Sequence, residues 1–294
     1  MTLLWLALLA SALCGVANLL DRSLVHGDAD EASPMTLLAI GGAIHSVMAL
    51  FLGAWTMPVY GLDPTVFVPL FLNGAIYSLA IWLYLSCLKT EDTSRVVPFF
   101  QLIPLFGLVM ANLRLGELPT PFDRIGIACL VAGGLALSLK RGVVRGRLAL
   151  FMILAAGLIA LSDVVFAEFG RGHAFSGAVF ADWCGKGVFG LLALASPRAR
   201  RGFLPGLRSK IGLMLAGEVT YAIGDALFDI AKLVMPVAIA QAAFCSQPLF
   251  VYLGVILLAS RFPSLREEPT GAGERIRKLT GILLMVAGGI VLST

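Results

Sequence analysis

The chain has 294 residues, of which 59% are hydrophobic and only 14% charged, and its mean hydropathy is +0.91. A soluble protein carries about a quarter charged residues, so this chain lacks the polar surface that a soluble fold of its size needs. The formal net charge of +4 is attributed to loops and does not point to nucleic acid. We therefore expect an integral membrane protein whose main partner is the lipid bilayer.

Apolar runs near the roughly 20 residues that cross a bilayer as a helix predict ten transmembrane helices. The first run lacks the basic residues that open a signal peptide, so we expect it to be retained. Most connections are short, but polar loops are expected at 196–210 and 261–278. The predicted helices cover 3–21, 35–57, 66–87, 95–115, 123–139, 148–169, 174–195, 211–231, 237–260 and 279–293.

In the first half of the chain, several uncharged polar side chains fall inside predicted helices. Asn73 and Tyr77 are four residues apart in the third helix and suit hydrogen bonding to a substrate, although core packing explains them equally well. Gln101 lies between two prolines, where kinks free backbone carbonyls, so we expect it to help bind a ligand. Glu117, three residues after Arg114, lies at a helix end and is predicted to have a structural or gating role.

The sixth and seventh predicted helices bring ionisable side chains to bilayer depth. Each such group costs about 2.5–3.5 kcal/mol on insertion scales, so it needs a reason to be there. Asp163 is a candidate for substrate binding or coupling, with a structural role as the alternative. Asp182 and Lys186 are four residues apart, the spacing that places opposite charges on one helix face. This spacing favours a self-neutralising structural pair.

The eighth predicted helix carries the densest set of polar residues. Glu218, Tyr221, Asp225 and Asp229 lie along one stripe at 100° per residue. Acids cannot face lipid, so we expect the stripe to face the interior and to relay protons or bind an amine. Alternatively, Asp229 pairs with Lys232 near the membrane surface while Glu218 caps a neighbouring helix. No cation lies within one turn of Asp225 in the sequence, which predicts a carboxylate without a close partner.

The two halves of the chain repeat each other. The run GIACLVAGGLALS from Gly126 recurs as GILLMVAGGIVLS from Gly281, and QLIPLF from Gln101 is answered by CSQPLF from Cys245. Superposing the prolines of the second pair of runs places Tyr77 on Tyr221. Five helices per repeat is an odd number, so the repeats must have opposite orientation in the membrane. The fold class predicted is an all-α membrane protein of two inverted five-helix repeats, residues 1–142 and 143–294.

Gln241 and Gln247 flank the region of the ninth helix that matches Gln101, and Gln241 is a further candidate for substrate binding. Lys and Arg are concentrated in the loops after the first, third, fifth, seventh and ninth helices. The positive-inside rule places those loops in the cytoplasm and both termini outside. We expect a multi-pass protein of the inner (plasma) membrane.

The first repeat resembles a known family. The segments that carry the resemblance are Tyr84–Lys89 (YLSCLK), Val97-Pro98, Pro104-Leu-Phe106, Leu115-Gly116-Glu117 and Gly126 with Gly133-Gly134. They are similar to the EamA repeat of the drug/metabolite transporter superfamily. The resemblance implies ten helices, a central cavity between the halves and alternating access without ATP. The second half departs from the pattern, because Ser260-Arg-Phe262 stands where the first half has Leu-Gly-Glu117.

These patterns predict a secondary active transporter of a small metabolite, with an amine or amino-acid-like compound as the first candidate and protons as the candidate coupling ion. The alternative is a non-transporting scaffold or lipid-handling subunit, which would have no need of three acids on one interior helix face. The sequence contains no P-loop, HExxH or GxSxG motif, so an enzyme is not expected. Five cysteines without a CxxC pair predict no metal site. No cofactor is expected. The sequence is compatible with either a monomer or a dimer.

Overall fold

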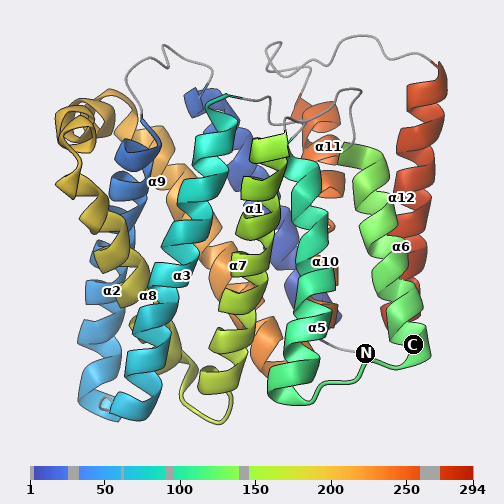
Figure 1. Cartoon of the computed structure of the whole chain (residues 1–294), viewed down its shortest axis with the longest axis horizontal. Helices are drawn as coiled ribbons and strands as arrows, with labels where there is room; N and C mark the ends of the chain where they lie inside the picture. The colour runs from blue at the N-terminus through green and yellow to red at the C-terminus, as the bar shows by residue number, and fades with distance from the viewer. Residues whose placement is uncertain are drawn as a thin grey trace.

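The structure, a computed structural model, describes residues 3–25, 33–60, 63–90, 96–138, 146–258 and 272–293. Every regular element in this part of the chain is helical, which confirms the all-α prediction. The first half contains α1 (Leu4–Val25), α2 (Pro34–Tyr60), α3 (Pro64–Leu88), the 3-10 helix η1 (Val97–Leu102), α5 (Ile103–Leu115) and α6 (Pro121–Ser138). The second half contains α7 (Gly146–Gly170), α8 (Phe175–Leu191), the 3-10 helix η2 (Leu192–Ala195), α9 (Pro197–Val234), α10 (Val237–Phe244), α11 (Gln247–Leu258) and α12 (Ala272–Ser293). The helices run side by side, and both ends of the chain lie at the same end of the bundle (Figure 1).

The predicted helix count differs from the observed one. The described residues form eleven α-helices instead of ten, because the predicted range 237–260 is divided into α10 and α11. The predicted range 95–115 is likewise divided, into the 3-10 helix η1 and α5. Prolines at or near both breaks explain them, since proline lacks the backbone N–H that a continuous helix uses. The prediction of a loop at 196–210 is also wrong, because α9 begins at Pro197. Residues 272–278 of the other expected loop belong to α12, and 259–271 lie outside the described residues.

Six segments of the described chain are apolar and long enough to cross a membrane. This number is below the ten predicted spans: the apolar segment Leu4–Ala17 of α1 is shorter than the others, and α9 and α12 each begin with a basic stretch. The qualifying segments are Pro34–Trp55, Pro64–Leu88, Pro98–Leu115, Gly146–Gly170, Phe175–Ala195 and Val237–Gly254.

The last helices of the two halves, α6 and α12, are joined by backbone contacts. A Cβ atom added to Gly281 would lie 2.8 Å from the carbonyl oxygen of Gly133, and one added to Gly288 would lie 2.8 Å from that of Gly126. Residue number therefore rises along α6 as it falls along α12, so the helices are antiparallel. The repeated glycines bring the two backbones together, as small residues do between membrane helices.

Gly288→Ala should lower the thermal stability of the purified protein, while Gly289→Ala should leave it unchanged or raise it. A methyl group at 288 would meet Gly126 O, Cys129 and Leu130 at 2.8–3.0 Å, whereas position 289 has nothing within 4 Å. Overpacking of this kind costs about 1–3 kcal/mol, whereas alanine in an open helix position is favoured over glycine by about 0.5–1 kcal/mol. Equal unfolding midpoints for the two variants in detergent would contradict the contact between α6 and α12.

Residues at matching positions of the two halves also touch each other. The Tyr77 and Tyr221 hydroxyls are 2.7 Å apart, and Gln101 Nε2 donates a hydrogen bond to Cys245 O at 3.1 Å. Each pair is separated by 144 residues, the offset that superposes Pro104 on Pro248. Helix packing follows the same plan, because α1 packs on α9, α3 on α7 and α2 on α8.

Candidate functional site

One face of α9 brings four polar side chains into the interior of the bundle. Tyr221, Asp225, Asp229 and Lys232 follow one another at spacings of four, four and three residues, so they lie along one line of the helix. Asp225, Asp229 and Lys232 are at most 6% exposed. The predicted stripe therefore faces other helices.

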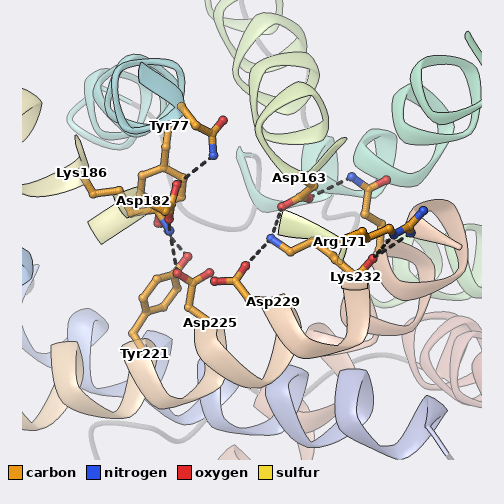
Figure 2. Close-up of polar contacts among 11 residues, drawn as sticks. Tyr77, Asp163, Arg171, Asp182, Lys186, Tyr221, Asp225, Asp229 and Lys232 are labelled. Carbon is orange, nitrogen blue, oxygen red and sulfur yellow. Dashed lines mark hydrogen bonds and ion pairs between the residues drawn. The ribbon is translucent and has the colours of Figure 1, made fainter. Parts of the chain in front are cut away.

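The first charged cluster, which we call the Lys186 site, joins α3, α8 and α9 (Figure 2). Lys186 Nζ lies 2.8 Å from Asp182 Oδ2 and 2.7 Å from Asp225 Oδ2, and 4.4 Å from the centre of the Tyr77 ring. Asn73 Nδ2 donates a hydrogen bond to Asp182 Oδ1 at 2.9 Å. The expectation that Asp225 lacks a close partner is therefore wrong. Its partner comes from α8, 39 residues earlier in the chain.

The second cluster, the Lys232 site, joins α7, α9 and α10. Lys232 Nζ lies 2.9 Å from Asp163 Oδ1 and 2.6 Å from Asp229 Oδ1. Gln241 Nε2 donates a hydrogen bond to the other Asp163 oxygen at 2.9 Å. The rings of two phenylalanines, one on α7 and one on α9, lie 4.9 and 4.6 Å from the ammonium and complete its surroundings: Phe166 and Phe228. The Asp229–Lys232 pair expected from the sequence is present, but it is buried.

Together the two clusters contain more acids than bases. Four carboxylates share two ammonium groups, so the network carries two excess negative charges when all of its members are ionised. Asp229 Oδ2 is buried and has no hydrogen-bond partner in the described structure. Uncompensated charge in a low-dielectric interior is costly. The network is therefore suited to accept added positive charge.

A metal ion is the less suitable occupant of this network. One oxygen from each of Asp182, Asp225 and Asp229 lies within 4.8 Å of the others, as ligands of an ion would. The Lys186 ammonium, however, already lies against two of these three carboxylates. Carboxylates arranged around an ammonium and an aromatic face are the chemistry that recognises an organic amine.

Two of the predicted site residues lie outside the network just described. Gln101 is fully buried at the contact with Cys245, where its amide lies against Gly134. Glu218 lies nearly two turns before Asp225 on α9 and approaches Gly41 of α2. The remaining candidates lie in the two lysine sites or at the tyrosine contact: Asn73, Tyr77, Asp163, Tyr221, Asp225, Asp229 and Gln241.

The aromatic contacts of the two lysines were not predicted from the sequence, and neither lysine was predicted to be the centre of a site. Phe228 precedes Lys232 by four residues, a spacing that places the two side chains on one helix face and could have indicated their contact. Phe166 and Tyr77 reach their lysines from other helices. Contacts between residues of different helices cannot be predicted from their spacing in the sequence.

Comparisons with known proteins agree with this description. Residues 1–139 match the model of the EamA-like transporter family. A protein of known crystal structure, whose description gives no function, aligns over 98% of this chain and 94% of its own, with a TM-score of 0.68 and 18% identity. At that identity the likeness shows the fold alone. No curated protein sequence matches the chain. The likeness to the EamA-like transporter family and the apolar helices indicate a multi-pass membrane protein.

The Leu115-Gly116-Glu117 segment, which lies within the region similar to the EamA-like family, positions an acid at one end of the bundle. Gly116 has a φ of 67°, a left-handed conformation that suits glycine and ends α5. Its N–H bonds to Asn112 O, and the next N–H bonds to Ala111 O. The turn places Glu117 beside the end of α7, and this local structure explains the segment.

Glu117 and Arg171 form what we call the latch. Arg171 Nη1 lies 2.6 Å from Glu117 Oε1, and Glu117 Oε2 accepts a hydrogen bond from Val237 N at 2.8 Å. Arg171 Nη2 donates to the carbonyl oxygens of Lys232 and Met235 at 2.8 and 2.9 Å. The latch therefore ties the first half of the chain to the C-terminal end of α9. Glu117 was predicted to be structural or gating, and its contacts fit both roles.

A second ion pair between the halves lies nearer the surface. Arg114 Nη2 and Nε contact Glu168 Oε2 at 2.9 and 3.1 Å, and the two side chains are 55% and 26% exposed. The bonds recorded for this pair join side chain to side chain. Exposed pairs of this kind contribute about 0–1 kcal/mol to stability.

Proposed function

We propose that this protein is a secondary active transporter that moves a small amine-containing or amino-acid-like metabolite across the plasma membrane by alternating access, coupled to protonation of α9 carboxylates. The observation that carries the proposal is the buried network of four aspartates and two lysines on α7, α8 and α9 of the second half, which Asn73 and Tyr77 contact from α3 of the first half. Ionisable groups at this depth are expensive and mark pathways for ions and substrates. A scaffold or lipid-handling subunit gives no reason for four aspartates around two lysines in its interior.

The proposal includes two inverted repeats, residues 1–142 and 143–294, with ten spans in all. On this account η1 with α5, and α10 with α11, each form one broken span. Discontinuous helices of this kind supply ligand sites in many carriers. Contact between equivalent residues, as between Tyr77 and Tyr221, is what a two-fold axis produces. The antiparallel packing of α6 on α12, which have the same sequence pattern, also supports opposite orientations.

Orientation in the membrane is part of the proposal and rests on the distribution of Lys and Arg. Both chain ends lie at one end of the bundle (Figure 1), in keeping with an even number of crossings. The positive-inside rule would place this end outside the cell. The latch would then close the outer mouth, and the network would be reached from the cytoplasm.

Uptake into proteoliposomes tests the function. Purified protein is reconstituted with an imposed pH gradient, and uptake is measured for radiolabelled primary amines, amino acids and, as comparison sets, organic anions and neutral sugars. We expect saturable uptake of at least one amine-bearing compound at ten times the rate of protein-free liposomes or more, and loss of accumulation when the gradient is dissipated. Uptake confined to anions or sugars, or no uptake of any compound, would contradict the proposal.

A further inference from the structure

The Lys186 site has the features of a receptor for a free ammonium ion. Two carboxylate oxygens contact Nζ at 2.7 and 2.8 Å, and the face of Tyr77 lies 4.4 Å away. The three contact residues come from three helices, and Lys186 is only 6% exposed. All of these contacts are made to the ammonium itself. An untethered amine of the same charge could therefore make them too.

The two carboxylates differ in their relation to Lys186. Asp182 lies one turn earlier on the same helix, so it can keep its pair with Lys186 whatever α9 does. Asp225 belongs to α9, and its contact with Lys186 depends on how α8 and α9 are placed. Asp225 can thus exchange partners while Lys186 stays neutralised by Asp182.

We propose that Lys186 is a tethered competitor for the substrate amine. In the state described here its ammonium occupies the site, and an incoming primary ammonium displaces it from Asp225 while Asp182 retains it. The inference rests on the proposed function and adds a rule of selectivity to it. While Asp225 is ionised, a neutral or anionic compound that displaced Lys186 would leave the Asp225 charge buried without a partner, which is strongly unfavourable, so the ionised site admits only cationic groups.

The opposing possibility is that Lys186 is a permanent counter-ion that fastens α8 to α9. The two accounts differ in what happens when the tether is removed. A displaceable competitor leaves behind a vacant site that binds free ammonium more tightly than the wild-type protein does. If Lys186 is a permanent counter-ion, its removal leaves two carboxylates that repel each other. The protein then collapses at this site or unfolds, and it does not bind an added amine.

The experiment measures the unfolding midpoint of detergent-purified Lys186→Ala and wild-type protein against n-propylammonium chloride. We expect a saturable rise in the variant, with half-saturation at a concentration at least tenfold below that of the wild type. Sodium chloride and tetramethylammonium chloride at equal ionic strength serve as controls, because neither can donate hydrogen bonds to the carboxylates. Lys186→Ala/Asp225→Asn should lose the response, and Lys89→Ala, at the exposed end of α3, should behave as wild type.

Each result bears on the inference. A folded Lys186→Ala protein without a propylammonium response overturns it, as does an equal response to sodium. If the variant is lost during purification, the preparation is repeated with propylammonium present, and with Lys186→Met, which keeps the volume of the stem. Recovery that requires propylammonium supports the inference, whereas failure of both variants with and without it overturns the inference.

The test also separates this inference from the proposed function. Wild-type proteoliposomes that take up an amine, together with an unresponsive Lys186→Ala protein, would remove the inference and keep the transporter. A responsive variant, together with wild-type protein that transports no amine, would leave an ammonium site in a protein of another function.

Discussion

Asp225→Asn is expected to abolish amine uptake while leaving the fold intact. Asparagine has the size of the acid but no charge, so it cannot exchange one cation for another. Lys186 keeps its contact with Asp182 at 2.8 Å, and no ammonium is left buried without a counter-ion. We therefore expect an unfolding midpoint close to that of the wild type, uptake reduced at least tenfold, and residual uptake that does not respond to the pH gradient.

The matched control is Glu168→Gln, which removes a carboxylate from the exposed pair with Arg114. This variant should transport at a rate close to that of the wild type, because its charge lies outside the buried network. Uptake by Asp225→Asn with an unchanged dependence on the gradient would show that Asp225 is not the coupling residue. Asp229, whose Oδ2 atom has no partner in the described structure, would then be the next residue to test.

Exchanging the two charged residues of the latch should lower the stability of the protein, even though the ion pair itself is kept. In Glu117→Arg/Arg171→Glu the ion pair is kept, but a carboxylate at 171 would face the carbonyl oxygens of Lys232 and Met235. An arginine at 117 would in turn face the N–H of Val237. Hydrogen bonds to charged groups are worth about 1.5–3 kcal/mol, and partial exposure of the latch reduces this. We expect the exchange to lower stability by about 1–3 kcal/mol, measured by thermal unfolding.

The outer pair supplies the comparison. The bonds recorded between Arg114 and Glu168 join only their side chains, so Arg114→Glu/Glu168→Arg should retain wild-type stability and transport. If both double variants have wild-type stability, the hydrogen bonds from the latch to the backbone contribute little. If both double variants lose stability, the general charge distribution at this end of the bundle determines stability, and not the specific hydrogen bonds of the latch.

The sequence was sufficient to predict an all-helical protein, most of its helices and the polar face of α9. Hydrophobic runs and the 100° periodicity depend only on neighbours in the chain, and Asp225 and Asp229 lie in the interior that this periodicity implied. The repeat also predicted that Tyr77 and Tyr221 are equivalent, and these two residues touch. Patterns that depend on local spacing could thus be read directly.

Contacts between helices could not be read in the same way. Lys186 is adjacent to Asp182 on α8, so the sequence favoured a closed pair, whereas the structure adds Asp225 from α9. Arg171 showed no partner in its own segment, yet it contacts Glu117, which lies 54 residues earlier. Such partners are set by helix packing, and polarity alone led the segment 196–210 to be assigned to a loop although it is helical.

The glycine contacts between α6 and α12 restrict how the molecule can move. Backbones that touch at Gly133 with Gly281 and at Gly126 with Gly288 cannot slide along each other without first separating. These helices lie at one edge of the bundle, and α2 and α8 lie at the opposite edge (Figure 1). A Cβ atom added to Gly42 of α2 would likewise lie 2.7 Å from the carbonyl carbon of Gly190 of α8. The two halves are thus joined by backbone contacts at both edges, so a rearrangement of the halves would have to separate one of these contacts or rotate about both.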